Sequence, residues 1–157
     1  MLLGELLVAQ GFVTVADTEL ALARQKNYGG RIGESFIALG LIAKSTLDGV
    51  LRKQHELASA VLNYENLAAK AKQIHGSDHP ETNRQRFYLA RALIAAGNPA
   101  EAVDLAQTAL AGHEAALGGD HSWTRESAQL VADALAALNR TTSSDKPGNV
   151  LAPSINR

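Results

Sequence analysis

Residues 31–42, Arg-Ile-Gly-Glu-Ser-Phe-Ile-Ala-Leu-Gly-Leu-Ile, repeat the pattern of residues 2–13, Leu-Leu-Gly-Glu-Leu-Leu-Val-Ala-Gln-Gly-Phe-Val. The same offset continues downstream, where Leu22 corresponds to Leu51. A fixed internal period of this kind indicates two copies of one structural unit. We therefore expect residues 1–55 to form a duplicated unit, in which each copy contains a short helix, a glycine turn and a longer helix.

The first copy has recognisable helix boundaries. A short helix over residues 4–10 is expected to end at Gly11, because glycine readily adopts the left-handed conformation that closes a helix. Thr14 is a good N-cap for the next helix, and Asp17 lies at the capping-box position three residues later. This second helix is expected to end near Lys26, before an Asn-Tyr-Gly-Gly turn.

The second copy predicts the same order of elements. Its short helix is expected over residues 33–39, with Gly40 as its end. The long helix that follows is expected over residues 44–74, continuous or bent near His55. Such a helix would join the first unit to the next one directly, without a flexible linker.

A second duplication, with a longer period, follows the first. His-Gly-Ser-Asp-His-Pro-Glu-Thr at residues 75–82 returns as Leu-Gly-Gly-Asp-His-Ser-Trp-Thr at residues 117–124. Alanine- and leucine-rich segments flank both loops, and these residues enter helices at little cost. We therefore expect an all-α fold, with further helices over residues 81–96, 99–117 and 123–139.

The composition excludes several functional classes. Of the 157 residues, 46% are hydrophobic and none is cysteine, so disulfides and cysteine-ligated metals are excluded. The net charge of -1 gives no bulk attraction to a nucleic acid polymer or to an anionic membrane. With no signal peptide and no apolar run of about 20 residues, we expect a cytoplasmic protein without membrane insertion. Residues 141–157, rich in Ser, Thr, Pro, Asn and Gly, are expected to form a disordered tail.

The segment from 56 to 140 carries a helix-pair pattern. Leu-Ala at residues 89–90 precedes Gly-Asn-Pro-Ala-Glu-Ala at residues 97–102 and Ala-Leu at residues 109–110. This pattern resembles a tetratricopeptide repeat, and the period of the second duplication resembles the longer variant of kinesin light chains and many bacterial proteins. The resemblance implies a protein partner bound on a concave helical surface. Because repeat units need neighbours, we expect this short array to pack on the N-terminal unit or on another copy of the chain.

Aromatic residues and histidines in this segment are assigned mainly to structure. Of the three candidate exposed aromatics, Phe87, Tyr88 and Trp123, the first two are expected in the core between helices. His79 and His121 occupy equivalent loop positions, where Asp-His-Pro serves to start a helix. No His-x-x-x-His spacing occurs within an expected helix, where it would place two ligands on one face, so no metal site is expected.

The second copy of the N-terminal duplication follows a longer motif, which spans residues 31–54. It begins with Arg-Ile-Gly at residues 31–33, continues with aliphatic residues around Gly40, and ends with Leu47, Leu51 and Gln54 at fixed spacing. This motif resembles the MshEN domain, the N-terminal domain of type II secretion and type IV pilus assembly ATPases. The resemblance implies binding of the bacterial second messenger cyclic di-GMP by two such motifs.

The implied residues suit a dianion that carries two guanines. Helix N-termini attract phosphate oxygens, glycine allows a close approach, and an arginine fork can pair with phosphate or guanine. Leucines offer an apolar surface to purine and ribose, and glutamines can form hydrogen bonds at the edge of the ligand. The implied site consists of Arg31, Ile32, Gly33, Leu47, Leu51 and Gln54 from the second copy, and of Leu3, Gly4, Leu22 and Gln25 from the first.

The first copy departs from the motif at two positions. Leu2 replaces the arginine and Thr18 replaces an aliphatic residue. Leu2 cannot form the charge-assisted hydrogen bonds of an arginine. Either this half-site is weakened, or a single arginine suffices, or the start of the chain is incomplete. In a further alternative, Arg31 only pairs with Glu34 or Ser35 on the surface.

The sequence carries no pattern for catalysis or for a cofactor. It lacks the Gly-x-x-x-x-Gly-Lys-Ser/Thr loop of an ATPase, and no nucleophile is paired with a base. The leading hypothesis is a non-enzymatic bacterial signalling adaptor that binds cyclic di-GMP through residues 1–55 and a protein partner through residues 56–140. The alternative is a protein docking or scaffold module, related to secretion or pili, without nucleotide binding.

Overall fold

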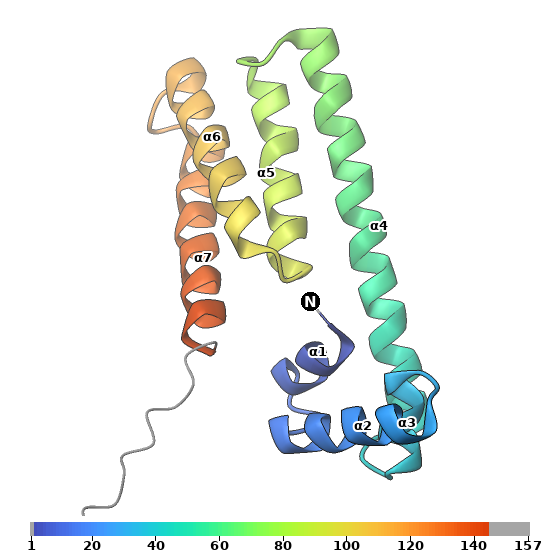
Figure 1. Cartoon of the computed structure of the whole chain (residues 1–157). Helices are drawn as coiled ribbons and strands as arrows, with labels where there is room; N and C mark the ends of the chain where they lie inside the picture. Colours follow the sequence, from blue (N-terminus) through green and yellow to red (C-terminus); the bar gives the residue numbers. More distant parts are fainter. Residues whose placement is uncertain (1, 145–157) are drawn as a thin grey trace, which may run out of the picture. The chain divides into compact units, whose positions relative to one another are not determined.

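The structure is a computed structural model that describes residues 2–144. These residues form helices and no strand, which confirms the predicted all-α fold (Figure 1). The final helix continues to Ser144, so it extends past the expected end near Asn139. The tail beyond Ser144, for which disorder was expected, lies outside the described residues. The helices are α1 (Leu3–Ala9), α2 (Val15–Tyr28), α3 (Ile32–Ala38), α4 (Lys44–His75), α5 (Pro80–Ala95), α6 (Pro99–Leu117) and α7 (Ser122–Ser144).

The chain divides into two compact units, Met1–Ser59 and Ala60–Arg157. The division falls inside α4, four residues after the boundary expected at residue 55. α4 is one unbroken helix through His55, where a continuous or bent helix was expected, so both units share its backbone (Figure 1). Its first half contributes Leu47 and Val50 to the core of the first unit.

The first unit keeps the duplication that its sequence predicts. Both short helices end at a glycine turn, since Gly11 and Gly40 have φ values of 74° and 70°. The core that the two copies share contains Leu7 from α1 and Phe36 from α3, both without exposed surface.

The predicted N-cap at Thr14 is confirmed. Its Oγ1 accepts a hydrogen bond of 3.1 Å from the Asp17 backbone N–H, and the Asp17 carboxylate accepts one of 2.8 Å from the Thr14 N–H. The bond from the Thr14 N–H, together with one of 2.7 Å that the Thr14 hydroxyl donates to the same carboxylate, favours its charged form and lowers the pKa of Asp17. The helix continues to Tyr28, two residues past the expected end at Lys26.

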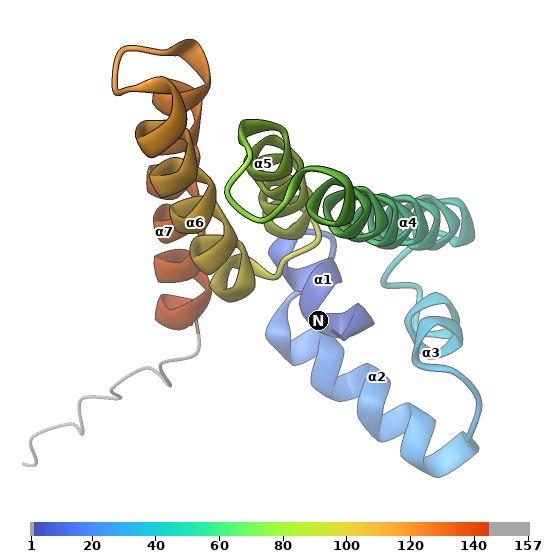
Figure 2. The same cartoon turned by 90° about the horizontal axis from the view of Figure 1, so that it is seen from above.

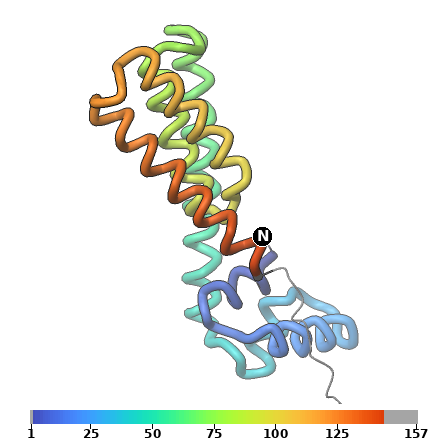
Figure 3. Tube along the Cα trace, turned by 90° about the vertical axis from the view of Figure 1, so that its left-hand side faces the viewer, coloured from blue at the N-terminus to red at the C-terminus, as the bar shows by residue number. Residues whose placement is uncertain are grey.

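The second unit is a row of helices that run in alternating directions (Figure 3). α4 and α7 lie at opposite edges of the row, with α5 and α6 between them (Figures 1 and 2). Tyr64 of α4 stacks on Tyr88 of α5 with ring centroids 5.7 Å apart. Phe87 is buried and Tyr88 is half-buried, so the expected core positions of these rings are confirmed. Small fully buried residues let the helices approach closely: Ala90, Ala102, Ala106 and Ala109.

Candidate functional site

A groove of about 530 Å³ opens between α5 and α7 in the second unit. Its apolar surface comes from one ring and two aliphatic side chains, and its polar surface from three charged side chains. Since α5 and α7 start after equivalent loops of the second duplication, the groove lies between equivalent helices of successive repeats. The lining residues are Phe87, Arg91, Ile94, Glu126, Leu130 and Asp133.

One ion pair holds Glu126, a residue that lines this groove. Arg84 Nη1 lies 2.7 Å from Glu126 Oε2, and the two residues occupy the same position of successive repeats. The Arg84 guanidinium also lies over three aromatic rings, with centroid distances of 4.6 Å to Phe87, 4.9 Å to Tyr88 and 5.0 Å to Trp123. These contacts hold the Arg84 side chain in place, and through the ion pair Arg84 positions Glu126, which lines the groove.

A second pair of equivalent positions, Arg91 and Asp133, lines the same groove without pairing. Both side chains are exposed, and neither forms an ion pair with another residue in the part of the chain that the structure describes. Arg91 lies 5.8 Å from the Phe87 ring centroid, and the Asp133 carboxylate accepts a hydrogen bond from Gln129. The groove thus presents a cation on α5 and an anion on α7, on either side of an apolar surface.

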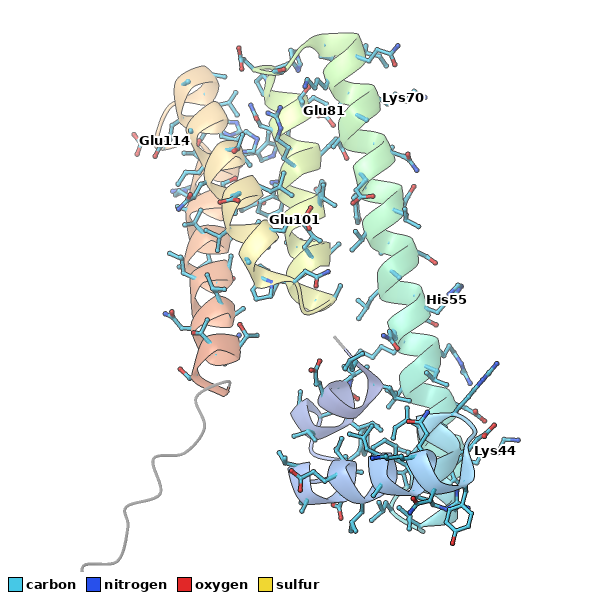
Figure 4. All side chains as sticks on the ribbon, viewed as in Figure 1. Lys44, His55, Lys70, Glu81, Glu101 and Glu114 are labelled. Atoms are coloured by element: carbon cyan, nitrogen blue, oxygen red, sulfur yellow. The ribbon has the colours of Figure 1, made fainter. Side chains whose placement is uncertain are left out.

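The two repeat loops are built alike. His79 Nδ1 accepts a hydrogen bond of 3.2 Å from the Glu81 N–H, and His121 Nδ1 accepts one of 3.2 Å from the Trp123 N–H. The predicted role of both histidines in starting a helix is therefore confirmed; Glu81 marks the start of α5 in Figure 4. Across residues 2–144, no three side chains of the metal-ligating types come together in a cluster.

A buried histidine joins the helices of the second unit. His113 of α6 has no exposed surface, and its Nδ1 lies 2.9 Å from the Ser127 hydroxyl of α7. Its Nε2 lies 3.2 Å from the Pro80 carbonyl at the start of α5, which can only accept, so the neutral ring donates from Nε2. Burial disfavours the charged ring and lowers the pKa of His113.

In the first unit, side chains of the same unit lie where a Cβ atom of either motif glycine, Gly4 or Gly33, would project. A Cβ at Gly33 would lie 2.9 Å from the Leu47 side chain, and one at Gly4 would lie 2.8 Å from the Thr18 side chain. Thr18 and Leu47 are equivalent positions of the duplication. The missing Cβ atoms of both glycines therefore allow these side chains of the same unit to pack closely.

The remaining predicted residues divide into buried and exposed groups. Leu47 is buried, and Leu3 and Ile32 pack against the same core. Gln25 is half-buried, and its Nε2 donates a hydrogen bond of 2.9 Å to the Gly30 carbonyl. The exposed residues are Arg31, Leu22, Leu51 and Gln54.

Acidic side chains occupy the start of both short helices. The Glu34 carboxylate accepts a hydrogen bond of 3.1 Å from the Arg31 N–H, and the Glu5 carboxylate accepts one of 2.8 Å from the Leu2 N–H. An anion that approached these helix ends would meet a carboxylate in the first turn.

The charged pairs of the groove were missed by sequence reasoning, although a signal for them existed. Arg84 and Arg91 each have an acidic residue, Glu126 and Asp133, at the equivalent position of the next repeat. Comparing the repeats position by position for charge as well as for apolar residues would have revealed both pairs.

Comparison with known proteins found a match within the second unit only. A family model described as "Tetratricopeptide repeat" matches residues 88–122, which cover the end of α5, all of α6 and the following loop. No curated protein and no solved structure matches the chain. None of the described helices combines the length and apolar character needed to cross a membrane.

Proposed function

We propose that the chain is a non-enzymatic adaptor that binds a protein partner in the groove between α5 and α7. The main support is the unpaired Arg91 and Asp133 on either side of an apolar surface. A polypeptide can place an apolar side chain between them and offer groups of both charges to the walls. The tetratricopeptide match over residues 88–122 favours the same reading, because such repeats generally mediate protein binding.

The test uses charge reversal at exposed positions, which leaves the core intact. Arg91→Glu and Asp133→Lys should each weaken capture of a specific partner from cell extract by about tenfold or more, as expected for about 1.4 kcal/mol or more. Glu101→Lys on α6 is the matched control, since Glu101 is exposed and does not line the groove (Figure 4). Partners retained equally by all three variants would refute a binding role for the groove.

A second candidate function, binding of cyclic di-GMP, is proposed for the first unit. It is favoured by the exposed Arg31 at the start of α3 and by the exposed Leu51 and Gln54 on α4. Leu2 in place of arginine and the carboxylate of Glu34 beside Arg31 both weaken such a site. In this proposal the chain is a bacterial signalling adaptor; without the ligand it is a docking module alone.

Calorimetric titration with cyclic di-GMP decides between these two functions. We expect heat of binding from the native chain and little from Arg31→Ala, because the arginine supplies the charge-assisted contact. Lys72→Ala is the control, since it removes an exposed cation from the part of α4 that belongs to the other unit. The absence of heat and of a thermal shift at high micromolar ligand would leave only the docking function, and binding that survives Arg31→Ala would place the site elsewhere.

A further inference from the structure

Each repeat of the second unit is a pair of helices, but the unit starts with the second helix of a pair and ends with the first helix of another. In the register of the second duplication, Ala60 and Val61 of α4 correspond to Ala102 and Val103 of α6, so residues 60–75 form a second helix of a pair. α7 corresponds to α5 and forms a first helix. Within residues 2–144, α4 therefore lacks the first helix that would complete its pair, and α7 lacks the second helix that would complete its own.

The complete pair, α5 with α6, shows how the two helix types fit together. A Cβ at Gly112 of α6 would collide with the side chain of Asn83 of α5, so these two positions face each other directly. In an antiparallel pair, each step forward along one helix is matched by a step back along the other. This register places Arg86 opposite Ala109 and Leu93 opposite Ala102. Leu93 is 1% exposed and Ala109 is 0% exposed.

The same positions are open to solvent on the two edge helices. Leu135 of α7, the equivalent of Leu93, is 42% exposed. Leu67 of α4, the equivalent of Ala109, is 39% exposed. Lys70, the equivalent of Gly112, is exposed and projects from α4 away from α5 (Figure 4). These open faces are the two halves of the interface that α5 and α6 form within the chain.

We infer that the α7 face of one copy packs on the α4 face of a second copy, which completes a helix pair between two chains. The register of the complete pair places Ala128 of one copy opposite Leu67 of the other. It also places Leu135 opposite Ala60. Each leucine thus faces an alanine, which gives the alternation of large and small side chains that packs helices closely.

One position opposes this association. Asn83 faces Gly112 in the complete pair. Between two copies, the equivalent residues are Arg125 of one copy and Lys70 of the other. Two cations that face each other repel, and dissolved salt screens this repulsion. We therefore expect the association to be weak at low ionic strength and to strengthen as salt is added.

The contact joins two different faces, so it is a head-to-tail contact and not a two-fold symmetric one. After the first contact, one copy keeps a free α4 face and the other keeps a free α7 face. Such contacts generate rings if the rotation closes and open chains if it does not. This behaviour separates the inference from a symmetric dimer.

Sedimentation velocity over a range of protein concentrations tests the inference. The native chain should form species larger than a dimer, and Lys70→Glu should tighten association by about tenfold, equivalent to about 1.4 kcal/mol, as repulsion becomes attraction. Leu67→Asp and Leu135→Asp should each abolish association. Leu62→Asp is the control, since Leu62 is 60% exposed on α4 but lies outside the inferred contact.

A mixture of the two defective variants gives the sharpest result. Leu67→Asp keeps an intact α7 face and Leu135→Asp keeps an intact α4 face, so their mixture should form a one-to-one dimer and nothing larger. A native chain that stays monomeric at all concentrations, or a mixture that stays monomeric, would overturn the inference. Arg91→Glu should associate like the native chain, so this outcome is independent of the groove proposed to bind a partner.

Discussion

At the scale of the residue, the buried polar side chain of His113 helps to fix the packing of the helices in the second unit. His113 connects three helices because both of its ring nitrogens find partners, the Ser127 hydroxyl and the Pro80 carbonyl. A buried polar group without a partner is costly, so this arrangement favours one packing over others. Ser35 in the first unit is different: its hydroxyl is buried without a hydrogen-bond partner among the described residues.

His113 predicts a loss of stability in mild acid. Burial is the main cause of its lowered pKa; Arg84 and His121 act in the same direction, while the Pro80 carbonyl and Glu126 oppose it. The folded chain therefore binds fewer protons at this ring than the unfolded chain, whose value is near 6.5. The contribution of His113 is fully present above that value and is lost as the pH falls from 6.5 through the lowered folded pKa.

Denaturant unfolding on both sides of pH 6.5 measures this effect. His113→Gln keeps an amide that can donate and accept but does not titrate, so its free energy of unfolding should fall less steeply with acid. Equal slopes for the two proteins would show that His113 does not contribute to the acid sensitivity.

At the scale of the element, glycines inside helices have opposite roles in α4 and α6. Gly49 has open space where a side chain would extend, whereas Gly112 lies against Asn83. The sequence alone treats both as weak points of a helix. Only the packing of α6 on α5 distinguishes them.

The same substitution at these two glycines should therefore change stability in opposite directions. Gly49→Ala should raise the free energy of unfolding by about 0.5–1 kcal/mol, because alanine loses less backbone entropy. Gly112→Ala should lower it by about 1–3 kcal/mol, because the added methyl overpacks the contact with Asn83. Thermal and denaturant unfolding measure both. Stabilisation by Gly112→Ala would mean that Asn83 moves aside at no cost.

At the scale of the whole molecule, α4 is the element that both units use. Leu47 and Val50 belong to the core of the first unit, and Val61 and Tyr64 pack against the core of the second. Because α4 is one helix that runs from the first unit into the second, unfolding of its part in one unit removes backbone hydrogen bonds from its part in the other. We therefore expect the two units to unfold together.

A proline in the middle of α4 should uncouple them. Ser59→Pro removes a helical hydrogen bond and costs about 3 kcal/mol. Calorimetry should then record two transitions where the native chain gives one. Ser59→Ala is the control, because Ser59 is exposed and alanine preserves the helix. A single unchanged transition in Ser59→Pro would contradict coupling through α4.

The sequence by itself determined the order and type of the elements. Periodic apolar residues, the capping residue Thr14 and the turn glycines Gly11 and Gly40 act within a few residues of themselves. Such local signals are fully written in the chain, so the helices of the described part follow from them, with ends within a few residues of those expected. The role of His79 and His121 follows for the same reason.

The tertiary structure alone decided which side chains meet and which remain open. Gly33 allows Leu47 to pack, and Arg84 binds Glu126, because helix packing brings together residues far apart in sequence. No short pattern records such distances. The groove and the open faces of α4 and α7 are likewise products of packing: a side chain is exposed or buried according to the neighbour that the fold places beside it, and not according to its own identity.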